Sequence, residues 1–210
     1  MRAFTRIWHY LQAFRQAKRN RSDLTGWLVR RPQLLSATMA YETALLFSNR
    51  LDPRLKELAE LKTAGLVSCE FCLDIGSALA NSSGITEKQL LDLPRYRTSD
   101  AYTDLERLVL SFAEAMTSTP AVGTILTDLR TDLLTHLSKS QLTELAAAIA
   151  WENQRARLNQ SLGVRPTGMA DGNACALPEP PAAQWPVRDH HTPDLIQLAE
   201  NPPAYPPNIG

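Results

Sequence analysis

The stretch PRLKELAELKTAGLVSCEFCLDIGSALA, residues 53–80, decides the fold of this chain. Asp52-Pro53 offers an N-cap followed by proline at the first helical position, which is a common way for a helix to begin. Apolar residues then recur at spacings of three and four, the period of a helix with one buried face. The stretch therefore predicts two consecutive helices, over about 53–66 and 69–82, with Ser68 as the N-cap of the second.

The rest of the chain before residue 170 shows the same helical pattern. The whole chain contains only nine glycines, and the alternating β-branched runs that indicate strands are missing. Capping-box spacing occurs at Thr86, Thr103 and Ser138, each followed three residues later by Gln or Glu. Further helices are predicted over about 2–20, 22–31, 34–48, 87–92, 103–117, 122–136 and 139–161. The sequence thus predicts an all-α, multi-helix array.

Charge is distributed unevenly along a chain that is neutral overall. Lys and Arg together count 22, as do Asp and Glu, which argues against a nucleic-acid partner because such partners require a basic excess. Residues 1–31 hold eight basic side chains against Asp23 alone, so this head carries +7 and the remainder −7. The amphipathic head could pack on a neighbouring subunit, lie on an anionic membrane surface through residues 1–21, or be a transit peptide. Packing is our first interpretation.

Three segments follow from these patterns: a basic amphipathic helical extension over 1–33, a helical domain over 34–169 and a Pro-rich tail over 170–210. Nine of the fourteen prolines lie at or after Pro178, so we expect the tail to wrap a neighbour or to stay disordered. The chain has three cysteines, no secretory signal and no apolar run near the length of a membrane span. We therefore expect a cytoplasmic protein in a reducing compartment.

Cys69 and Cys72 stand at CxxC spacing at the start of a predicted helix. Backbone N–H groups and the helix dipole favour an anion there, so a thiolate is stabilised. Three residues of helical spacing also bring two sulfurs close enough to form a disulfide. The alternatives are two buried structural cysteines or half of a zinc site, but Cys175 and His190-His191 do not stand at a recognisable ligand spacing.

Glu57 precedes Cys69 by twelve residues, on the helix that leads to the thiols. It shares a helical face with Leu61, so we expect it to point inward, while Lys56 and Glu60 form an exposed i,i+4 pair. A buried carboxylate beside a thiol can accept the thiol proton, directly or through water. The alternative is an ordinary solvated glutamate.

These residues resemble the carboxymuconolactone decarboxylase-like superfamily, and within it the alkylhydroperoxidase D (AhpD)-like branch, whose motif reads E-x11-C-x2-C-x3-H. Glu57, Cys69 and Cys72 match its first three positions. The stretch AIAWENQRARLN, residues 148–159, is similar to the terminal helix of that branch. The resemblance covers roughly residues 35–168.

The resemblance implies an AhpD-like helical fold that assembles as a homo-oligomer, a trimer or hexamer. By position, Cys72 would be the thiolate that attacks a peroxide, Cys69 the proton donor and resolving thiol, and Glu57 the carboxylate of the proton relay. The resulting disulfide would be reduced by a dithiol partner, lipoyl-bearing or thioredoxin-like. No metal, haem or flavin cofactor is expected, because the sulfurs carry both electrons.

The histidine of the motif falls on Gly76, which cannot move a proton. His136, at the end of a predicted helix, is the interior candidate to replace it, but we rather expect it to cap the carbonyls of that helix. The function we predict is a thiol–disulfide oxidoreductase of the peroxiredoxin type, an alkylhydroperoxidase that reduces hydroperoxides. The alternatives are a protein disulfide reductase with little peroxidase activity, or a non-enzymatic assembly or binding protein on the same fold. A lactone decarboxylase is less favoured because the cysteine pair is present.

Overall fold

The computed structural model describes residues 8, 11–13, 15–80, 83–119 and 121–179. Most of the helix predicted over 2–20, and the tail from 180 to 210, lie outside these residues.

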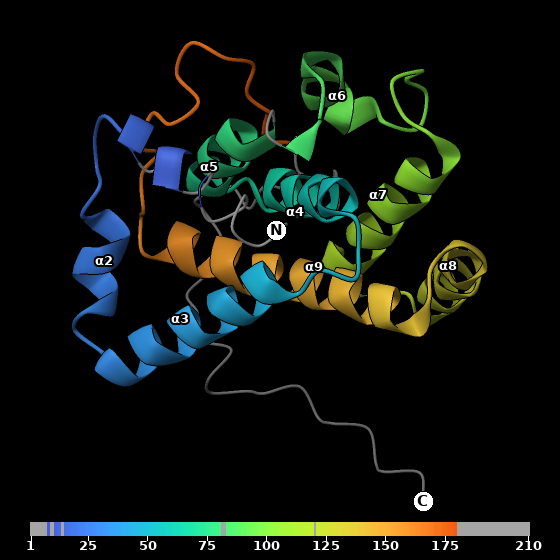
Figure 1. Ribbon diagram of the computed structural model, residues 1–210, viewed down its shortest axis with the longest axis horizontal. Coiled ribbons are helices and arrows are strands. Elements are labelled where there is room, and N and C mark those ends of the chain that lie inside the picture. The colour runs from blue at the N-terminus through green and yellow to red at the C-terminus, as the bar shows by residue number, and fades with distance from the viewer. Residues whose placement is uncertain (1–7, 9–10, 14, 81–82, 120, 180–210) are drawn as a thin grey trace, which may run out of the picture. The chain divides into compact units, whose positions relative to one another are not determined.

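The described residues are folded into helices, without a strand among them, which confirms the all-α prediction (Figure 1). The elements are α2 (Asp23–Leu28), α3 (Pro32–Phe47), α4 (Pro53–Val67), α5 (Glu70–Ala80), α6 (Glu87–Asp92), the 3-10 turn η2 (Leu93–Arg95), α7 (Asp104–Thr117), α8 (Gly123–His136) and α9 (Lys139–Ser161). Capping boxes open α6, α7 and α9 at the three predicted places. None of the helices in this part of the chain combines the length and apolarity needed to cross a membrane.

Helix α4 is the element around which the others pack (Figure 1). It contacts α5, α7 and α9. On one side, Leu58, Leu61 and Ala64 are each 1% exposed and belong to a core cluster that also contains the two cysteines of the CxxC motif. On the other side, Leu55 and Ala59 belong to a second cluster, shared with α7, α8 and α9. Because both clusters meet at α4, almost the whole helix is buried.

The prediction that Lys56 is exposed is wrong, because α4 is packed on both sides. Lys56 is 2% exposed, and its Nζ forms a buried ion pair with Glu144 of α9. Burial acts to raise the pKa of Glu144, but the hydrogen bonds from Lys56 and from the Leu51 N–H outweigh it and lower the pKa. The pair therefore ties α4 and α9 to the turn between α3 and α4.

The irregular segment from residue 165 to residue 179 runs over α5 (orange in Figure 1). The Asp74 carboxylate on α5 accepts four hydrogen bonds from it at 2.7–2.9 Å, three of them from backbone N–H groups between residues 167 and 170. Burial acts to raise the pKa of Asp74, but these hydrogen bonds outweigh burial and hold the pKa below its ordinary value. Asp74 is therefore an ionised anchor for the segment.

The later part of the segment also contacts α4 and α5. The Ala176 N–H donates to Oγ of Ser77 on α5 at 2.9 Å. The Glu179 carboxylate accepts from Nζ of Lys62, a side chain of α4 that is only 2% exposed, at 2.6 and 2.7 Å. The first part of the predicted tail is thus bound to the helical domain.

Replacing Asp74 by Ala should lower the free energy of unfolding by about 3 kcal/mol, because buried N–H groups lose a charged acceptor. A urea titration monitored by circular dichroism measures this loss. The control is Asp171→Ala, which removes an exposed carboxylate of the same segment that pairs with Arg19 at 3.1 Å. It should cost less than about 1 kcal/mol. Equal losses in the two variants would contradict the anchoring role of Asp74.

Helix α9 buries a second carboxylate against α4. Glu152 is 1% exposed, and its Oε1 lacks a hydrogen-bond partner within the described residues. Its Oε2 accepts from Nε of Arg155 at 2.7 Å. Burial, opposed by Arg155 and reinforced by Glu60, raises the pKa of Glu152 to about 7. The folded protein therefore retains a proton that the unfolded chain releases near pH 4.5.

Glu152 should lower the free energy of unfolding as the pH rises from 4.5 to about 7. In this range the unfolded chain releases the proton of Glu152, while the folded protein keeps it. In Glu152→Gln this penalty is absent. The unfolding free energy of the variant, relative to the unaltered protein, should increase by about 2–3 kcal/mol between pH 5 and pH 8. Urea titrations at pH 5, 6.5 and 8 measure the difference. A difference that stays constant over this range would show that Glu152 does not titrate in it.

Candidate active site

The two cysteines of the CxxC motif lie at the junction of α4 and α5. Cys69 and Cys72 are joined as a disulfide, with their Cα atoms 5.3 Å apart. The chain reverses direction at Ser68, which has a left-handed backbone with φ of 59° and ends α4. The Cys69 N–H then donates to the Ala64 carbonyl at 3.0 Å. The prediction that Ser68 is the N-cap of α5 is therefore wrong. Cys69, directly before Glu70, takes that position.

Each sulfur of the pair has an N–H donor beside it. The Cys72 backbone N–H donates to Sγ of Cys69 at 3.3 Å, so this sulfur caps the first turn of α5 as a serine oxygen would. The side-chain amide of Asn159 on α9 donates to Sγ of Cys72 at 3.7 Å. Donors of this kind, at the positive end of a helix, stabilise a thiolate. Both cysteines are buried, with exposures of 3% for Cys69 and 8% for Cys72.

Glu57 reaches α5 one turn beyond Cys72. The residue is 7% exposed, which confirms the inward orientation predicted for it. A Cβ placed on Gly76 would stand 3.8 Å from Oε1 of Glu57 and only 2.7 Å from Cδ2 of Leu61. The Leu61 side chain thus fills the space in which the motif's histidine would begin. The carboxylate of Glu57 remains as the titratable group on this side of the turn.

His136 does not replace the missing imidazole. It is the single histidine within the described residues, and it is exposed at the end of α8. Helix α8 packs on α7 and α9 rather than on the cysteine-bearing α5. His136 is therefore removed as a candidate for the motif's histidine, and it stands at the end of a helix as expected.

Asn159 was given no role by the sequence patterns. It is 1% exposed and follows Glu152 and Ala156 along one buried stripe of α9. A polar side chain at a buried helical position is the signal that could have drawn attention to it. The sequence pattern does not reveal the hydrogen-bond acceptor of this amide, because Cys72 is 87 residues away in sequence.

Among the described residues, no three His, Cys, Asp or Glu side chains form a group that could hold a metal ion. The His190-His191 pair of the zinc alternative lies outside these residues.

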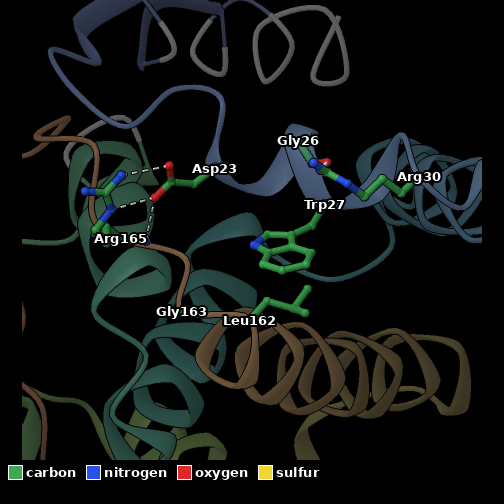
Figure 2. Close-up of a pocket in the computed structure, with 7 residues that line it drawn as sticks. All are labelled: Asp23, Gly26, Trp27, Arg30, Leu162, Gly163 and Arg165. Atoms are coloured by element: carbon green, nitrogen blue, oxygen red, sulfur yellow. Dashed lines mark hydrogen bonds and ion pairs between the residues drawn. The ribbon is translucent and has the colours of Figure 1, made fainter.

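A shallow hollow of about 600 Å³ lies between α2 and the end of α9 (Figure 2). Trp27 of α2 faces Leu162 across it, and Arg30, just after α2, also lines it. An ion pair between Asp23 and Arg165, with a shortest N–O distance of 2.9 Å, borders the hollow. Leu162 also packs against the core cluster of the two cysteines. The sequence patterns did not identify this hollow, because α2 and the end of α9 are far apart in the chain.

Comparison with protein families matches residues 32–115 to the carboxymuconolactone decarboxylase family. The chain is also 38% identical over 130 residues to the uncharacterized protein YnjA of Escherichia coli (strain K12), an alignment that covers 61% of this chain and 67% of YnjA. The family match contains Glu57, both cysteines and Gly76.

Solved structures share the arrangement of helices. A protein of unknown function from Agrobacterium tumefaciens, described as a candidate antioxidant defence protein AhpD, is 24% identical with a TM-score of 0.60, over 67% of this chain and 94% of that protein. The debrominase Bmp8 is 21% identical with a TM-score of 0.62, over 76% of this chain and 87% of that protein. At these identities the likeness concerns the fold. The family match and the relation to YnjA show that the chain belongs to the carboxymuconolactone decarboxylase family, and the solved structures show that it has an AhpD-like fold.

Proposed function

We propose that this protein is a thiol–disulfide oxidoreductase that reduces hydroperoxides with Cys69 and Cys72. The observation that carries the proposal is the position of the two sulfurs. They lie at bonding distance at the positive end of α5, and each has an N–H donor beside it. Buried structural cysteines need neither the disulfide geometry nor the donors.

The proposed reaction balances on the two thiols. The Cys72 thiolate attacks the hydroxyl oxygen of the hydroperoxide, the O–O bond breaks, and the leaving alkoxide takes a proton to become the alcohol. Cys72 is then a sulfenic acid. The Cys69 thiolate attacks its sulfur, water leaves, and the disulfide forms. The sum is one hydroperoxide and two thiols giving alcohol, water and one disulfide.

An external dithiol closes the cycle by exchange with the Cys69–Cys72 disulfide. One of its sulfurs attacks, a mixed disulfide forms, and its second sulfur releases the reduced pair. A lipoyl group or a thioredoxin-like protein has the required chemistry.

Glu57 is the proposed proton carrier of the cycle. Its carboxylate lies one turn from Cys72, where it can accept the thiol proton and return it to the alkoxide, directly or through water. Since Leu61 occupies the space beside Gly76, no imidazole assists at that turn.

This arrangement also supports the second candidate, a disulfide reductase with weak peroxidase activity. A thiolate leaving group needs less proton assistance than an alkoxide, because a thiol is much more acidic than an alcohol. The loss of the histidine at Gly76 therefore penalises peroxide reduction more than disulfide exchange. A non-enzymatic assembly or binding protein needs no reactive thiol at all. Reactivity of the thiols toward a hydroperoxide and toward a disulfide therefore distinguishes the peroxidase, the reductase and the assembly protein.

One equivalent of an organic hydroperoxide should convert the fully reduced protein to the Cys69–Cys72 disulfide. Peptide-mapped mass spectrometry measures the loss of two hydrogens from this pair. Cys72→Ser should lack the link, and Cys175, which is free and half-buried, should remain reduced. If both motif thiols stay reduced for hours while Cys175 oxidises, peroxidase activity is rejected. Reaction with a small disulfide then separates the reductase from the assembly protein.

The same assay examines Glu57. Glu57→Gln should slow oxidation of the pair by about 100-fold, the usual size of a general-base contribution. Glu60→Gln, on the half-buried side of the same helix, serves as the matched control and should react at nearly the unaltered rate. Equal rates in both variants would remove Glu57 from the mechanism.

We also infer that the chain forms a homo-oligomer through α3. Only Leu45 is buried on this 16-residue helix, while Leu34, Met39 and Phe47 are exposed by 56%, 57% and 54%. Three large apolar side chains exposed to this degree on one helix favour an interface. The AhpD-like fold supports a second copy of the chain as the partner.

Replacing Leu34 and Met39 together by Glu should shift the protein toward the monomer, because buried charges oppose association. Sedimentation velocity at micromolar concentration measures the mass. The control, Thr127→Glu with Thr131→Glu, adds the same charge to exposed positions of α8 and should leave the mass unchanged. A monomeric unaltered chain would contradict the inference at once.

A further inference from the structure

The side chain of Asn159 links the end of α9 to the redox pair. It is 1% exposed, and its Nδ2 lies 3.7 Å from Sγ of Cys72. Its backbone carbonyl accepts the Val164 N–H at 2.9 Å, and the left-handed Gly163 turns the chain immediately after α9. The amide is therefore held in place from both its side chain and its backbone.

The two sulfurs draw their hydrogen bonds from different sources. Cys69 receives its hydrogen bond from a backbone N–H of α5, which no side-chain substitution removes. The donor to Cys69 is the backbone N–H of Cys72 itself. The sulfur of Cys72 receives its own hydrogen bond from a different helix. Its donor is the Asn159 amide.

A donor at this sulfur matters because its surroundings are apolar. Cys72 is 8% exposed, and Phe71, Leu73 and Ala156 belong to the cluster around it. Burial disfavours a thiolate unless a hydrogen bond or a positive charge compensates. The position of the motif's histidine offers neither, because Gly76 has no side chain and Leu61 fills the space beside it.

We propose that Asn159 is a catalytic residue of this site, whose amide stabilises the thiolate of Cys72 and then the oxygen-bearing sulfenic acid formed on it. This inference rests on the proposed thiol chemistry. The amide keeps its protons throughout, so it supplies a dipole and a hydrogen bond, while the proton itself moves through Glu57. Of the two thiolates, the one on Cys72 is thus stabilised by a side chain, and the one on Cys69 by a backbone N–H.

The test measures the ionisation of the single thiol of Cys72. The parent is the full chain with Cys69→Ser and Cys175→Ser, in which serine is a favourable N-cap residue for α5. Alkylation by iodoacetamide is followed by mass spectrometry from pH 5 to pH 10. In Asn159→Leu the midpoint should move up by about one pH unit, so the rate at pH 7 falls about tenfold, as expected for one hydrogen bond to a charged group.

Two further variants separate this effect from damage to the fold. Asn159→Asp keeps the shape but places a negative charge beside the sulfur, so its midpoint should move up at least as far. Asn153→Leu removes a similar amide of α9, which donates to Thr117 Oγ1 at 3.0 Å and not to a cysteine. It should leave the midpoint unchanged. Circular dichroism confirms that each variant is helical.

Unchanged midpoints in both Asn159 variants would overturn the inference, as would a Cys72 thiol that resists alkylation up to pH 10 in the folded parent. Peroxide consumption by the unaltered chain is measured in parallel. Turnover without an Asn159 effect overturns this inference and leaves the proposed function standing. An Asn159 effect without turnover supports the contact with the thiolate and rejects the peroxidase.

Discussion

The burial of charged side chains on α4 is the constraint on which the rest of the structure depends. Ten residues of this helix are buried, and Lys56, Glu57 and Lys62 are among them. A buried charge is costly unless it is paired and hydrogen-bonded. Lys56 therefore brings Glu144 of α9 against it, and Lys62 binds Glu179 of the segment that follows α9. Removing one partner of either pair would leave an uncompensated charge in the core. The two pairs therefore let one helix position both α9 and residues 165–179.

The packing of α4 against α5 also determines the chemistry of the candidate site. Leu61 comes so close to Gly76 that a Cβ at position 76 would stand 2.7 Å from its Cδ2, so the leucine would have to shift to admit a side chain. The Leu61 side chain occupies the space where the imidazole of the motif would begin, and the Glu57 carboxylate lies at the same turn after Cys72. The site therefore relies on a carboxylate, a backbone N–H and a side-chain amide. Such a set stabilises a thiolate well but delivers protons less readily than an imidazole near neutral pH.

Local patterns predicted the helices, the three capping boxes, the CxxC pair and the inward side of Glu57, because each depends on residues within a few positions of one another. The failures come from long-range packing. The exposure assigned to Lys56 was wrong because its partner Glu144 is 88 residues away. Asn159 and the anchoring of residues 167–170 by Asp74 were missed for the same reason. The N-cap was placed at Ser68 because sequence does not reveal a left-handed serine.

The burial of the two sulfurs bears on which substrates suit the site. Cys69 and Cys72 expose 3% and 8% of their surface, which leaves little room for the in-line approach of a disulfide embedded in a folded protein. A hydroperoxide group is small enough to enter beside a side chain. Re-reduction faces the same barrier, and a dithiol on a long, slender arm reaches a buried disulfide more easily than one embedded in a protein surface. Within the proposed function, this burial suits a small hydroperoxide as oxidant and a slender dithiol arm as reductant better than a reaction between two folded proteins.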